Sequence, residues 1–494
     1  MNMRAGGVNF IRQAEVVARL ARELPANSLL FQEESTRGYE CDGLSAYREI
    51  PMAVALPSNE DEVRAVLRAC HEMKVPVIAR GAGTGLSGGA LPSKDGVLLS
   101  LAKMKKILAV DPYARIARVQ PGVRNLAISE AAAPYGLYYA PDPSSQIACT
   151  IGGNVAENSG GVHCLKYGLT VHNVLRVRGF TIEGELIELG SEAPDAPGYD
   201  LLALAIGSEG LLAVTTEVTV KLVPKPEVAR VVMASYSDVR TAGDAVASII
   251  AEGIIPAGLE MMDKPATRAV EEFVHAGYDL DAAAILLCES DGTPEEVEEE
   301  VARVQAVLAR TGATAMRVST SEQERLRFWA GRKAAFPAVG RISPDYYCMD
   351  GTIPRKRLGE VLEFISEMEA KYGLRCPNVF HAGDGNLHPL ILFDANEPDQ
   401  LHRTEQFASE VLRKCIEVGG TITGEHGVGI EKINEMCVQF RPKELEVFHA
   451  LKRAFDAFAL LNPGKAVPTL HRCAEFGAMH VHAGQLPHPE LPRF

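Results

Sequence analysis

The chain has 494 residues, of which 47% are hydrophobic and 23% charged, and its formal net charge at pH 7 is -14. This length predicts two or three domains that each bury a core, and the acidic balance argues against nucleic acid or an anionic membrane surface as the main partner. No apolar run approaches the roughly 18 residues of a membrane span, and residues 1–7 lack the apolar core of a signal peptide. We therefore expect a cytoplasmic protein without a direct membrane span, at most peripheral at the inner face of the membrane through its partners.

The N-terminal part of the chain predicts alternating helix and strand. A helical pattern runs from about Phe10 to Leu24, and residues 57–62 combine a capping Ser or Asn with the acidic residues of a first helical turn. This second helix is expected to end near Lys74, and the apolar run Val75–Ala79 then predicts a short strand.

A glycine-rich segment, Arg80–Gly89, follows this strand. Gly83–Gly88 formally matches the G-x-G-x-x-G pattern of dinucleotide-binding folds, but Pro92 and Gly96 stand where such a fold needs its crossover helix. The better interpretation is a wide loop whose backbone N–H groups form a nest for a pyrophosphate, with Arg80 close by. A merely flexible loop is less favoured, because the glycines come directly after a strand.

Small and polar residues recur in a second region, which we expect to be a loop. Its segments are 141–145, 150–154 and 158–161. Backbone amides and hydroxyls of this kind can bind phosphate, and small residues let a flat ring approach, so the region suits an extended cofactor. Strands at 97–101 and 116–120 and a helix at 124–135 precede it.

The chain between this region and the last third predicts a hairpin and then a second domain. Residues 173–189 predict a hairpin that turns at Glu183-Gly184, and residues 211–222 predict a strand. Pro224-Lys-Pro226 is typical of a domain boundary. Strand and helix patterns alternate from about residue 228, which fits a ferredoxin-like domain.

The last third contains His381-Ala-Gly-Asp-Gly-Asn-Leu-His388 and Gly424-Glu425-His426-Gly427. If Asp384-Gly385 forms a two-residue hairpin turn, His381 faces His388 across a ribbon, where directly opposed Cβ atoms are about 5 Å apart. Both imidazoles could then bind one divalent ion, with Glu425 as a third ligand and an open position for substrate. His426 would be a base within reach. An isolated histidine is more often packed or solvated near a turn, but this combination favours a site.

The blocks at 80–85, 141–145, 150–154 and 207–212 resemble the FAD-binding domain of the vanillyl-alcohol oxidase family. The resemblance implies an α+β fold: a two-part FAD-binding domain, a ferredoxin-like cap and a small helical C-terminal region. Members that bind flavin covalently usually carry a histidine in or near the first glycine loop, and residues 80–90 contain none. Non-covalent FAD is therefore expected. The expected segments are an N-terminal helical segment (1–50), the FAD-binding domain (51–226), the cap (227–420), a C-terminal helical segment returning to the flavin (421–470) and a tail (471–494).

The last third, and beyond it nearly the whole chain, is similar to the D-2-hydroxy-acid dehydrogenase branch and to the FAD-linked catalytic subunits of bacterial glycolate oxidases. This resemblance implies oxidation of a small 2-hydroxy acid, glycolate and also D-lactate, to the 2-oxo acid with hydride transfer to flavin N5. It implies metal ligands at His381, His388 and Glu425 for zinc or manganese, a catalytic base at His426, and a carboxylate anchor at Arg332. The implied cofactor-binding residues are Arg80, Gly81, Ala82, Gly83, Thr84, Gly85, Ser87, Gly88, Pro141, Asp142, Ser144, Ser145, Gly152, Gly153, Asn158, Gly160, Gly161, Glu209, Gly210 and Asn462.

The same resemblance implies partners for electron transfer. The ten cysteines form no C-x-x-C pair, so no iron–sulfur cluster is expected on this chain. A second FAD-domain subunit and an iron–sulfur subunit would pass electrons toward the membrane, and the histidines of the tail (His471, His480, His482 and His488) could bind one of them. A disordered or metal-scavenging tail is nearly as well favoured.

Two other functions stay open, while a third, a zinc hydrolase without flavin, is disfavoured because it leaves both glycine-rich segments unexplained. One is a free-standing D-lactate or D-2-hydroxy-acid dehydrogenase. The other is a non-catalytic FAD subunit of an oxidase complex, which would predict erosion of the histidine and glutamate motifs that are intact here. The hydroxyglutarate branch has a lysine just before its Asp-x-[Ser/Thr]-x-Pro stretch, where this chain has Cys348-Met349 before Asp350. This departure favours a short monocarboxylate as substrate.

Overall fold

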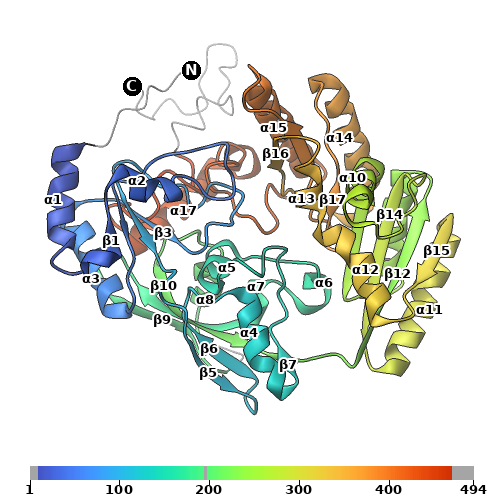
Figure 1. Ribbon diagram of the computed structural model, residues 1–494, viewed down its shortest axis with the longest axis horizontal. Helices are drawn as coiled ribbons and strands as arrows, with labels where there is room; N and C mark the ends of the chain where they lie inside the picture. The colour runs from blue at the N-terminus through green and yellow to red at the C-terminus, as the bar shows by residue number, and fades with distance from the viewer. Residues whose placement is uncertain (1–8, 194–196, 470–494) are drawn as a thin grey trace.

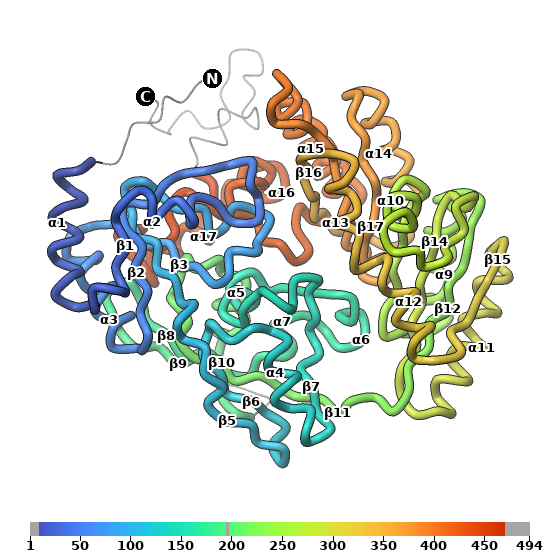
Figure 2. Tube along the Cα trace, viewed as in Figure 1, coloured from blue at the N-terminus to red at the C-terminus, as the bar shows by residue number. Residues whose placement is uncertain are grey.

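The computed structural model describes residues 9–193 and 197–469. The N-terminal half, drawn blue to teal in Figure 1, lies beside a second part drawn green to orange, and the C-terminal helices, drawn red, return to the N-terminal half. The tube in Figure 2 shows the same course of the chain, which passes from the first part to the second after β11 and returns to the first part with α17. The histidines predicted for the tail lie outside the described residues.

The first sheet contains three parallel strands and one antiparallel edge strand. In spatial order the strands are β1 (Leu29–Leu30), β2 (Ala53–Ala55), β4 (Val97–Ser100) and β3 (Val77–Arg80). Its helices are α1 (Phe10–Leu20), α2 (Glu33–Thr36) and α3 (Glu60–Met73), with 3-10 turns at Ala26–Ser28 and Arg37–Tyr39. The side chain of Asn59 caps α3, and Lys74 ends it in the left-handed conformation, as the capping pattern predicted. Successive strand residues, such as Val77 and Ile78, pack on opposite faces of the sheet.

The second sheet is antiparallel. Its strands are β5 (Ile107–Asp111), β6 (Ile116–Val119), β10 (Val214–Lys221), β8 (Val174–Phe180) and β9 (Leu186–Gly190). The predicted hairpin is confirmed, because β8 pairs with β9 and Gly184 in the turn has a φ of +73°. Near it lie α4 (Asn125–Ala132), a 3-10 turn (Ala133–Tyr135), α6 (Cys164–Tyr167), α7 (Thr170–Asn173), α8 (Leu201–Ala205) and the strand pair β7 (Leu137–Tyr138) and β11 (Val223–Pro224).

One segment expected to be loop is a helix. Residues Ile151–Glu157 form α5, which buries Ile151 and Val155 against the second sheet. Two glycines in its first turn weaken helix propensity, but burial of the apolar residues overrides that preference. The prediction of an irregular loop at 150–154 was therefore wrong.

The second part has a sheet with helices on both faces. Its strands are β15 (Ala315–Val318), β12 (Val228–Tyr236), β14 (Ala284–Gly292), β13 (Gly258–Asp263) and β17 (Val379–Phe380). The first four have the strand order 4-1-3-2 of a ferredoxin-like fold. One face packs on α9 (Val239–Ala251), α11 (Pro294–Arg310) and α14 (Leu358–Tyr372), and the other on α10 (Lys264–Val274), α12 (Glu322–Lys333) and α13 (Ala335–Val339).

The C-terminal segments connect the two parts. They comprise β16 (Asp345–Cys348), a 3-10 turn (Arg355–Arg357), β18 (Leu390–Phe393), α15 (Gln400–Glu417), α16 (Met436–Gln439) and α17 (Pro442–Phe455). After α17 the chain reaches the edge of the first sheet, where Leu461 bridges Val77. The buried Lys452 ammonium fixes this return by donating to the carbonyls of Leu211 and Leu461 at 2.7 and 2.8 Å. Among the described residues, no helix has both the length and the apolar composition needed to cross a membrane.

Candidate active site

A cavity of about 400 Å³, here called the main cavity, lies between the glycine-rich segments and residues of the C-terminal half. Of the predicted cofactor-binding residues, those that line it are Arg80, Gly81, Ala82, Gly83, Thr84, Gly85, Ser144, Ser145, Gly152, Gly153, Glu209 and Gly210. His388, Glu425 and His426 line the same cavity. The structure therefore brings the glycine loops and the predicted catalytic histidine to one space.

The walls of the main cavity fit a cofactor that needs close approach to the backbone. A Cβ on Gly81 would lie 2.3 Å from Thr150 Oγ1, so the first loop approaches the start of α5 this closely only because residue 81 is glycine. A Cβ on Gly152 would lie 2.6 Å from Pro121 Cβ, so α5 needs glycine there for its approach to Pro121. Thr150 Oγ1 is buried without a hydrogen-bond partner among the described residues. Such an unpaired group is expected where a ligand supplies the partner.

The guanidinium of Arg80 packs against the first glycine-rich loop. Its Nη1 donates to the carbonyl of Cys41 at 2.6 Å, and a Cβ on Gly83 would lie 2.2 Å from its Nη2. The loop thus folds over the guanidinium, and Gly83 has a φ of +74°, which favours glycine.

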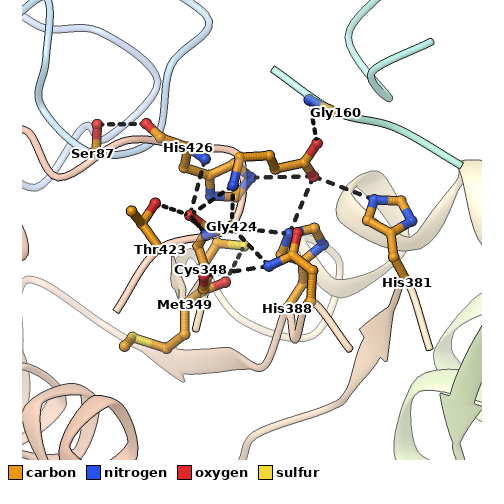
Figure 3. A network of polar contacts seen from close by, with 12 residues as sticks. Ser87, Gly160, Cys348, Met349, His381, His388, Thr423, Gly424 and His426 are labelled. Carbon is orange, nitrogen blue, oxygen red and sulfur yellow. Dashed lines mark hydrogen bonds and ion pairs between the residues drawn. The ribbon is translucent and has the colours of Figure 1, made fainter. Parts of the chain in front are cut away.

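Several predicted cofactor-binding residues do not line the main cavity but connect its walls. These are Ser87, Gly88, Pro141, Asp142, Asn158, Gly160, Gly161 and Asn462. Ser87 Oγ donates to the carbonyl of His426 at 2.9 Å, and the backbone N–H of Gly160 donates to Glu425 Oε2 at 2.9 Å (Figure 3). Asn462 Nδ2 donates to the carbonyls of Gly89 and Glu209. Ser87 and Gly160 thus hold the glycine-rich segments against the segment at 424–427, and Asn462 joins the first loop to Glu209.

The two-residue hairpin predicted between His381 and His388 is wrong. His381 bridges Asn386, not His388, and β17 and β18 pair with β13 and β16 instead of with each other. A type I′ turn needs positive φ at both central residues, and of the pair only Gly385 has it, at +77°. The four residues between His381 and Asn386 form a wider turn, and Gly383 N–H donates to the carbonyl of Leu259 at 2.8 Å.

The predicted metal-ligating side chains nevertheless come together. His381 Nε2 and His388 Nε2 each lie 3.2 Å from Glu425 Oε1, and the two imidazole centroids are 5.1 Å apart. His388 Nε2 is buried, and its contact with Glu425 is not aligned as a hydrogen bond. We call these three residues the histidine–glutamate cluster; one ligand atom from each lies within 4.8 Å of the others. Figure 3 shows His381 and His388 pointing to the same carboxylate.

A second set of possible ligands, Asp350, His388 and His426, is as compact, but the Asp350 carboxylate is already paired. It accepts from the backbone N–H groups of Gly424 and His426 at 3.0 and 2.9 Å, from Asn386 Nδ2 at 3.0 Å, and from the hydroxyl of Thr423. These donors occupy its lone pairs, so the carboxylate acts as an acceptor for the 423–426 loop. Of the two sets, the histidine–glutamate cluster has the donor atoms that are more available to hold a metal ion.

His426 lies beside the cluster and borders the main cavity. Its ring stacks on the ring of His388 with centroids 4.8 Å apart, and its Nδ1 is buried without a hydrogen-bond partner among the described residues. Burial lowers the pKa of His426 to about 4, although the charge of Asp350 opposes that shift. A neutral imidazole with a free nitrogen can accept a proton.

Arg332, the predicted carboxylate anchor, is buried and does not line the main cavity. Its Nε donates to Glu260 Oε2 at 2.6 Å, and Glu260 Oε1 lies 2.6 Å from His381 Nδ1. Burial alone would lower the pKa of His381, but Glu260 and Glu425 raise it to about 10. Arg332 Nη2 has no hydrogen-bond partner among the described residues, so one guanidinium nitrogen remains available.

Sequence reasoning missed Glu260 and Asp350. Glu260 stands alone in the apolar stretch Leu259–Met262, and Asp350 was noted only as the first residue of the Asp-x-[Ser/Thr]-x-Pro stretch, without a role in the site. A single acid inside a buried strand pattern is costly unless it is paired, and that was the one signal available.

Comparison with known proteins agrees with this geometry. The family model described as FAD binding domain matches residues 51–190, and the model described as FAD linked oxidases, C-terminal domain, matches residues 225–466. The chain is 62% identical to the glycolate oxidase subunit GlcD of Escherichia coli (strain K12) over 99% of this chain and 98% of the relative. It is 40% identical to GlcD of Bacillus subtilis (strain 168), covering 86% of this chain and 91% of that one. It is 32% identical to a D-lactate dehydrogenase of Anaerostipes hadrus, covering 90% and 95%.

Solved structures support the fold. A p-cresol methylhydroxylase matches with a TM-score of 0.77 at 16% identity over 94% of this chain and 98% of that chain. The 4-ethylphenol oxidase from Gulosibacter chungangensis matches with a TM-score of 0.79 at 16% identity over 93% and 98%. The predicted α+β fold, with its two-part N-terminal domain and ferredoxin-like cap, is confirmed.

Proposed function

This chain belongs to the FAD-linked oxidases, and from that premise we propose that it oxidises a small 2-hydroxy acid, glycolate and also D-lactate, to the 2-oxo acid. It is an FAD-dependent oxidoreductase. One observation carries the choice of substrate class: His388, Glu425 and His426 border the same cavity as the glycine loops. The relatives named GlcD and D-lactate dehydrogenase agree with that class.

Bound in the main cavity, FAD supplies the ring that accepts a hydride from the substrate. The glycine loops supply backbone N–H groups for its phosphates, with Thr150 Oγ1 as an additional unpaired group. Residues 80–90 contain no histidine for a covalent bond, so we propose that FAD binds non-covalently.

His381, His388 and Glu425 are the residues that would hold a divalent ion. Two imidazoles and one carboxylate suit zinc or manganese and leave a position open for substrate. An ion held there supplies a Lewis acid that lowers the pKa of the substrate hydroxyl. Gly160 supports the cluster by donating its N–H to Glu425 Oε2.

His426 and Arg332 would act directly on the substrate. The unpaired Nδ1 of His426 accepts the hydroxyl proton as the hydrogen on the α-carbon leaves with its electron pair, which gives the 2-oxo acid. Arg332 does not line the main cavity, and its unpaired Nη2 would bind a carboxylate that reaches past the cavity wall, by a charge-assisted hydrogen bond. Cys348 and Met349 are both buried and offer no cation for a second carboxylate, so a monocarboxylate is preferred.

The deciding experiment mixes the yellow protein anaerobically with glycolate, D-lactate and L-lactate and follows bleaching of the flavin band. Fast bleaching by glycolate and D-lactate, but not L-lactate, is expected. His426→Ala should slow bleaching by about 10²–10⁴-fold, whereas His402→Ala, at an exposed position on α15, should not. Bleaching of His426→Ala at the parental rate would remove the base assignment, and no bleaching of the parent by any of the acids would remove the substrate class.

The GlcD relatives are named as subunits, so we propose that electrons leave this chain to partner subunits, a second FAD-domain subunit and an iron–sulfur subunit, on the cytoplasmic side of the membrane. A free-standing D-lactate dehydrogenase is the second candidate, favoured by the relative from Anaerostipes hadrus. Purification from the native host distinguishes them: the first predicts co-purifying subunits with iron, and the second a chain that turns over alone with a soluble acceptor.

A further inference from the structure

One acidic side chain of the main cavity has no place in the reaction described above. Glu157 ends α5 and lines the cavity. Its Oε2 is buried without a hydrogen-bond partner among the described residues. Two glycines make room for the carboxyl group, because a Cβ on Gly89 would lie 2.8 Å from Oε1 and a Cβ on Gly427 would lie 2.1 Å from Oε2.

A second carboxyl group, that of Glu209, lies beside the first. A Cβ on Gly427 would also be 3.0 Å from Glu209 Oε1, so both acids approach the same glycine. Glu209 accepts from the backbone N–H groups of Val428 and Gly429, each at 2.7 Å. Among the described residues, Glu209 therefore has donors for a negative charge, and Glu157 has none.

Two neighbouring buried carboxyl groups cannot both ionise at low cost. Burial raises the pKa of Glu157 well above its ordinary range, and the charges of Glu209 and Asp42 raise it further. The ammonium groups of Lys432 and Lys465 oppose this shift without cancelling it. Burial and the neighbouring charges thus favour the protonated form of Glu157, the side chain of the pair without donors among the described residues.

We propose that Glu157 is a protonated carboxyl that donates a hydrogen bond to an oxygen or nitrogen atom of the flavin ring. Gly427, the glycine that it approaches, is next to His426, so the carboxyl lies on the side of the cavity where the reaction takes place. The proposal rests on the proposed binding of FAD in the main cavity, but it does not depend on which 2-hydroxy acid is the substrate. A hydrogen-bond donor to the flavin ring stabilises the reduced flavin more than the oxidised flavin, because the reduced ring has more electron density. It therefore raises the reduction potential of the flavin.

A purely structural role fits the contacts less well. An acid that only braced the loops would be expected to pair with a donor, as Glu209 does. Glu157 instead has a buried, unpaired oxygen at the wall of a cavity.

The test is the midpoint potential of the bound flavin in the full chain, measured by dye equilibration during slow reduction without substrate. Glu157→Ala should shift the potential negative by about 30 mV, which is a tenfold change for a two-electron couple. Glu157→Gln keeps an N–H donor of similar shape and should stay close to the parent. Glu300→Ala on α11, outside the cavity, is the control and should not change the potential.

A parental potential in Glu157→Ala with FAD bound would overturn the proposal, and so would equal shifts in the Ala and Gln variants. If Glu157→Ala does not bind FAD, infrared difference spectra of the parental holoprotein decide. A carboxylic-acid C=O band that moves on reduction and is missing from Glu157→Gln supports the proposal, and its absence from the parent overturns it. A chain that reduces normally but is not bleached by glycolate would contradict the proposed substrate and leave this result standing.

Discussion

The buried carboxylate of Asp350 accepts a hydrogen bond of 2.9 Å from the backbone N–H of His426. Gly424 and Glu425 donate to the same side chain, at 3.0 and 3.2 Å. Three successive N–H groups thus converge on one acceptor. This arrangement fixes the backbone from which Glu425 and His426 project toward the main cavity.

Asp350→Asn should therefore disturb the backbone of the 424–426 segment, although the side chain keeps nearly the same size. The amide replaces one acceptor oxygen by a donor that faces other donors, and a hydrogen bond to a charged group contributes about 1.5–3 kcal/mol. Flavin reduction by glycolate should slow at least about tenfold. Stopped-flow absorbance measures this rate. Asp345→Asn is the matched control, since Asp345 begins β16, the strand just before Asp350, and among the described residues its side chain accepts only from Ala395 N–H at 2.9 Å; equal rates in both variants would contradict the role of Asp350.

Glu260→Gln should weaken metal binding. Glu260 contacts both Arg332 and His381, and an amide oxygen can accept from only one of them. Loss of such a partner to a metal-binding histidine typically costs 10–100-fold in metal affinity or activity. Competition with a chromogenic chelator measures the affinity for zinc or manganese.

Asp263→Asn provides the comparison for Glu260→Gln. Asp263 lies on the same strand and is also buried, but it caps α10 and pairs with Asn378. This variant should lower thermal stability and leave metal affinity unchanged. A chain that binds neither metal with useful affinity would refute the metal site altogether.

The fold could be predicted from local patterns wherever those patterns were strong. The cap at Asn59 and the turn at Gly184 depend on side-chain capping and positive φ, which single residues specify. The helix α5 could not be predicted, because its glycines disfavour a helix and only tertiary burial of Val155 stabilises it. The exposed strand β5 was also missed. Its sequence, Ile107–Asp111, does not alternate apolar and polar residues, which is the usual signal of a half-exposed strand.

The candidate site could be predicted in part. His381, His388 and Glu425 stand in recognisable motifs and do meet, but the register that was expected to bring them together was wrong. Their actual positions depend on β13 and β16, the strands that pair with β17 and β18. Pairing between distant strands is set by the whole sheet, so Glu260 and Asp350 become visible only in three dimensions.

His163 joins the two parts of the molecule through a charged contact that should depend on pH. Its Nδ1 lies 2.8 Å from Asp142, and its Nε2 lies 3.2 Å from Glu289, which also accepts from Arg325 at 2.7 Å and from the indole of Trp329. Despite burial, the two acids raise the pKa of His163 well above its ordinary value. Burial of Glu289 opposes its ionisation, but His163 and Arg325 lower its pKa to about 2.

The sign of the pH effect follows from these shifts. The contribution of His163 to stability is complete below about pH 6.5 and is lost as the pH rises through its raised pKa, while that of Glu289 is complete above about pH 4.5 and is lost toward pH 2. His163→Gln should therefore lower the thermal midpoint most between about pH 4.5 and 6.5, by an amount equivalent to roughly 1–2 kcal/mol. Calorimetry from pH 4 to 10 measures the difference, which should shrink at the alkaline end; a constant difference would mean that His163 is neutral in the folded protein.

A substitution at Asn462 would test whether the glycine loops need contacts with the C-terminal segment to bind FAD. Its Nδ2 donates to the carbonyls of Gly89 and Glu209 at 3.0 and 2.7 Å, and its φ is +44°. Asn462→Gly keeps that backbone conformation at low cost but removes this donor from the carbonyl of Glu209, at about 1–3 kcal/mol. The carbonyl of Gly89 keeps a second donor, Lys465 Nζ at 3.1 Å. FAD affinity, measured by fluorescence of the released flavin, should fall about tenfold or more. Asn396→Gly, at an exposed position where the side chain contacts only Asp394, should leave affinity unchanged. If Asn462→Gly binds FAD as tightly as the parent, the loops hold their shape without the C-terminal segment, and the return of the chain to the first sheet serves stability alone.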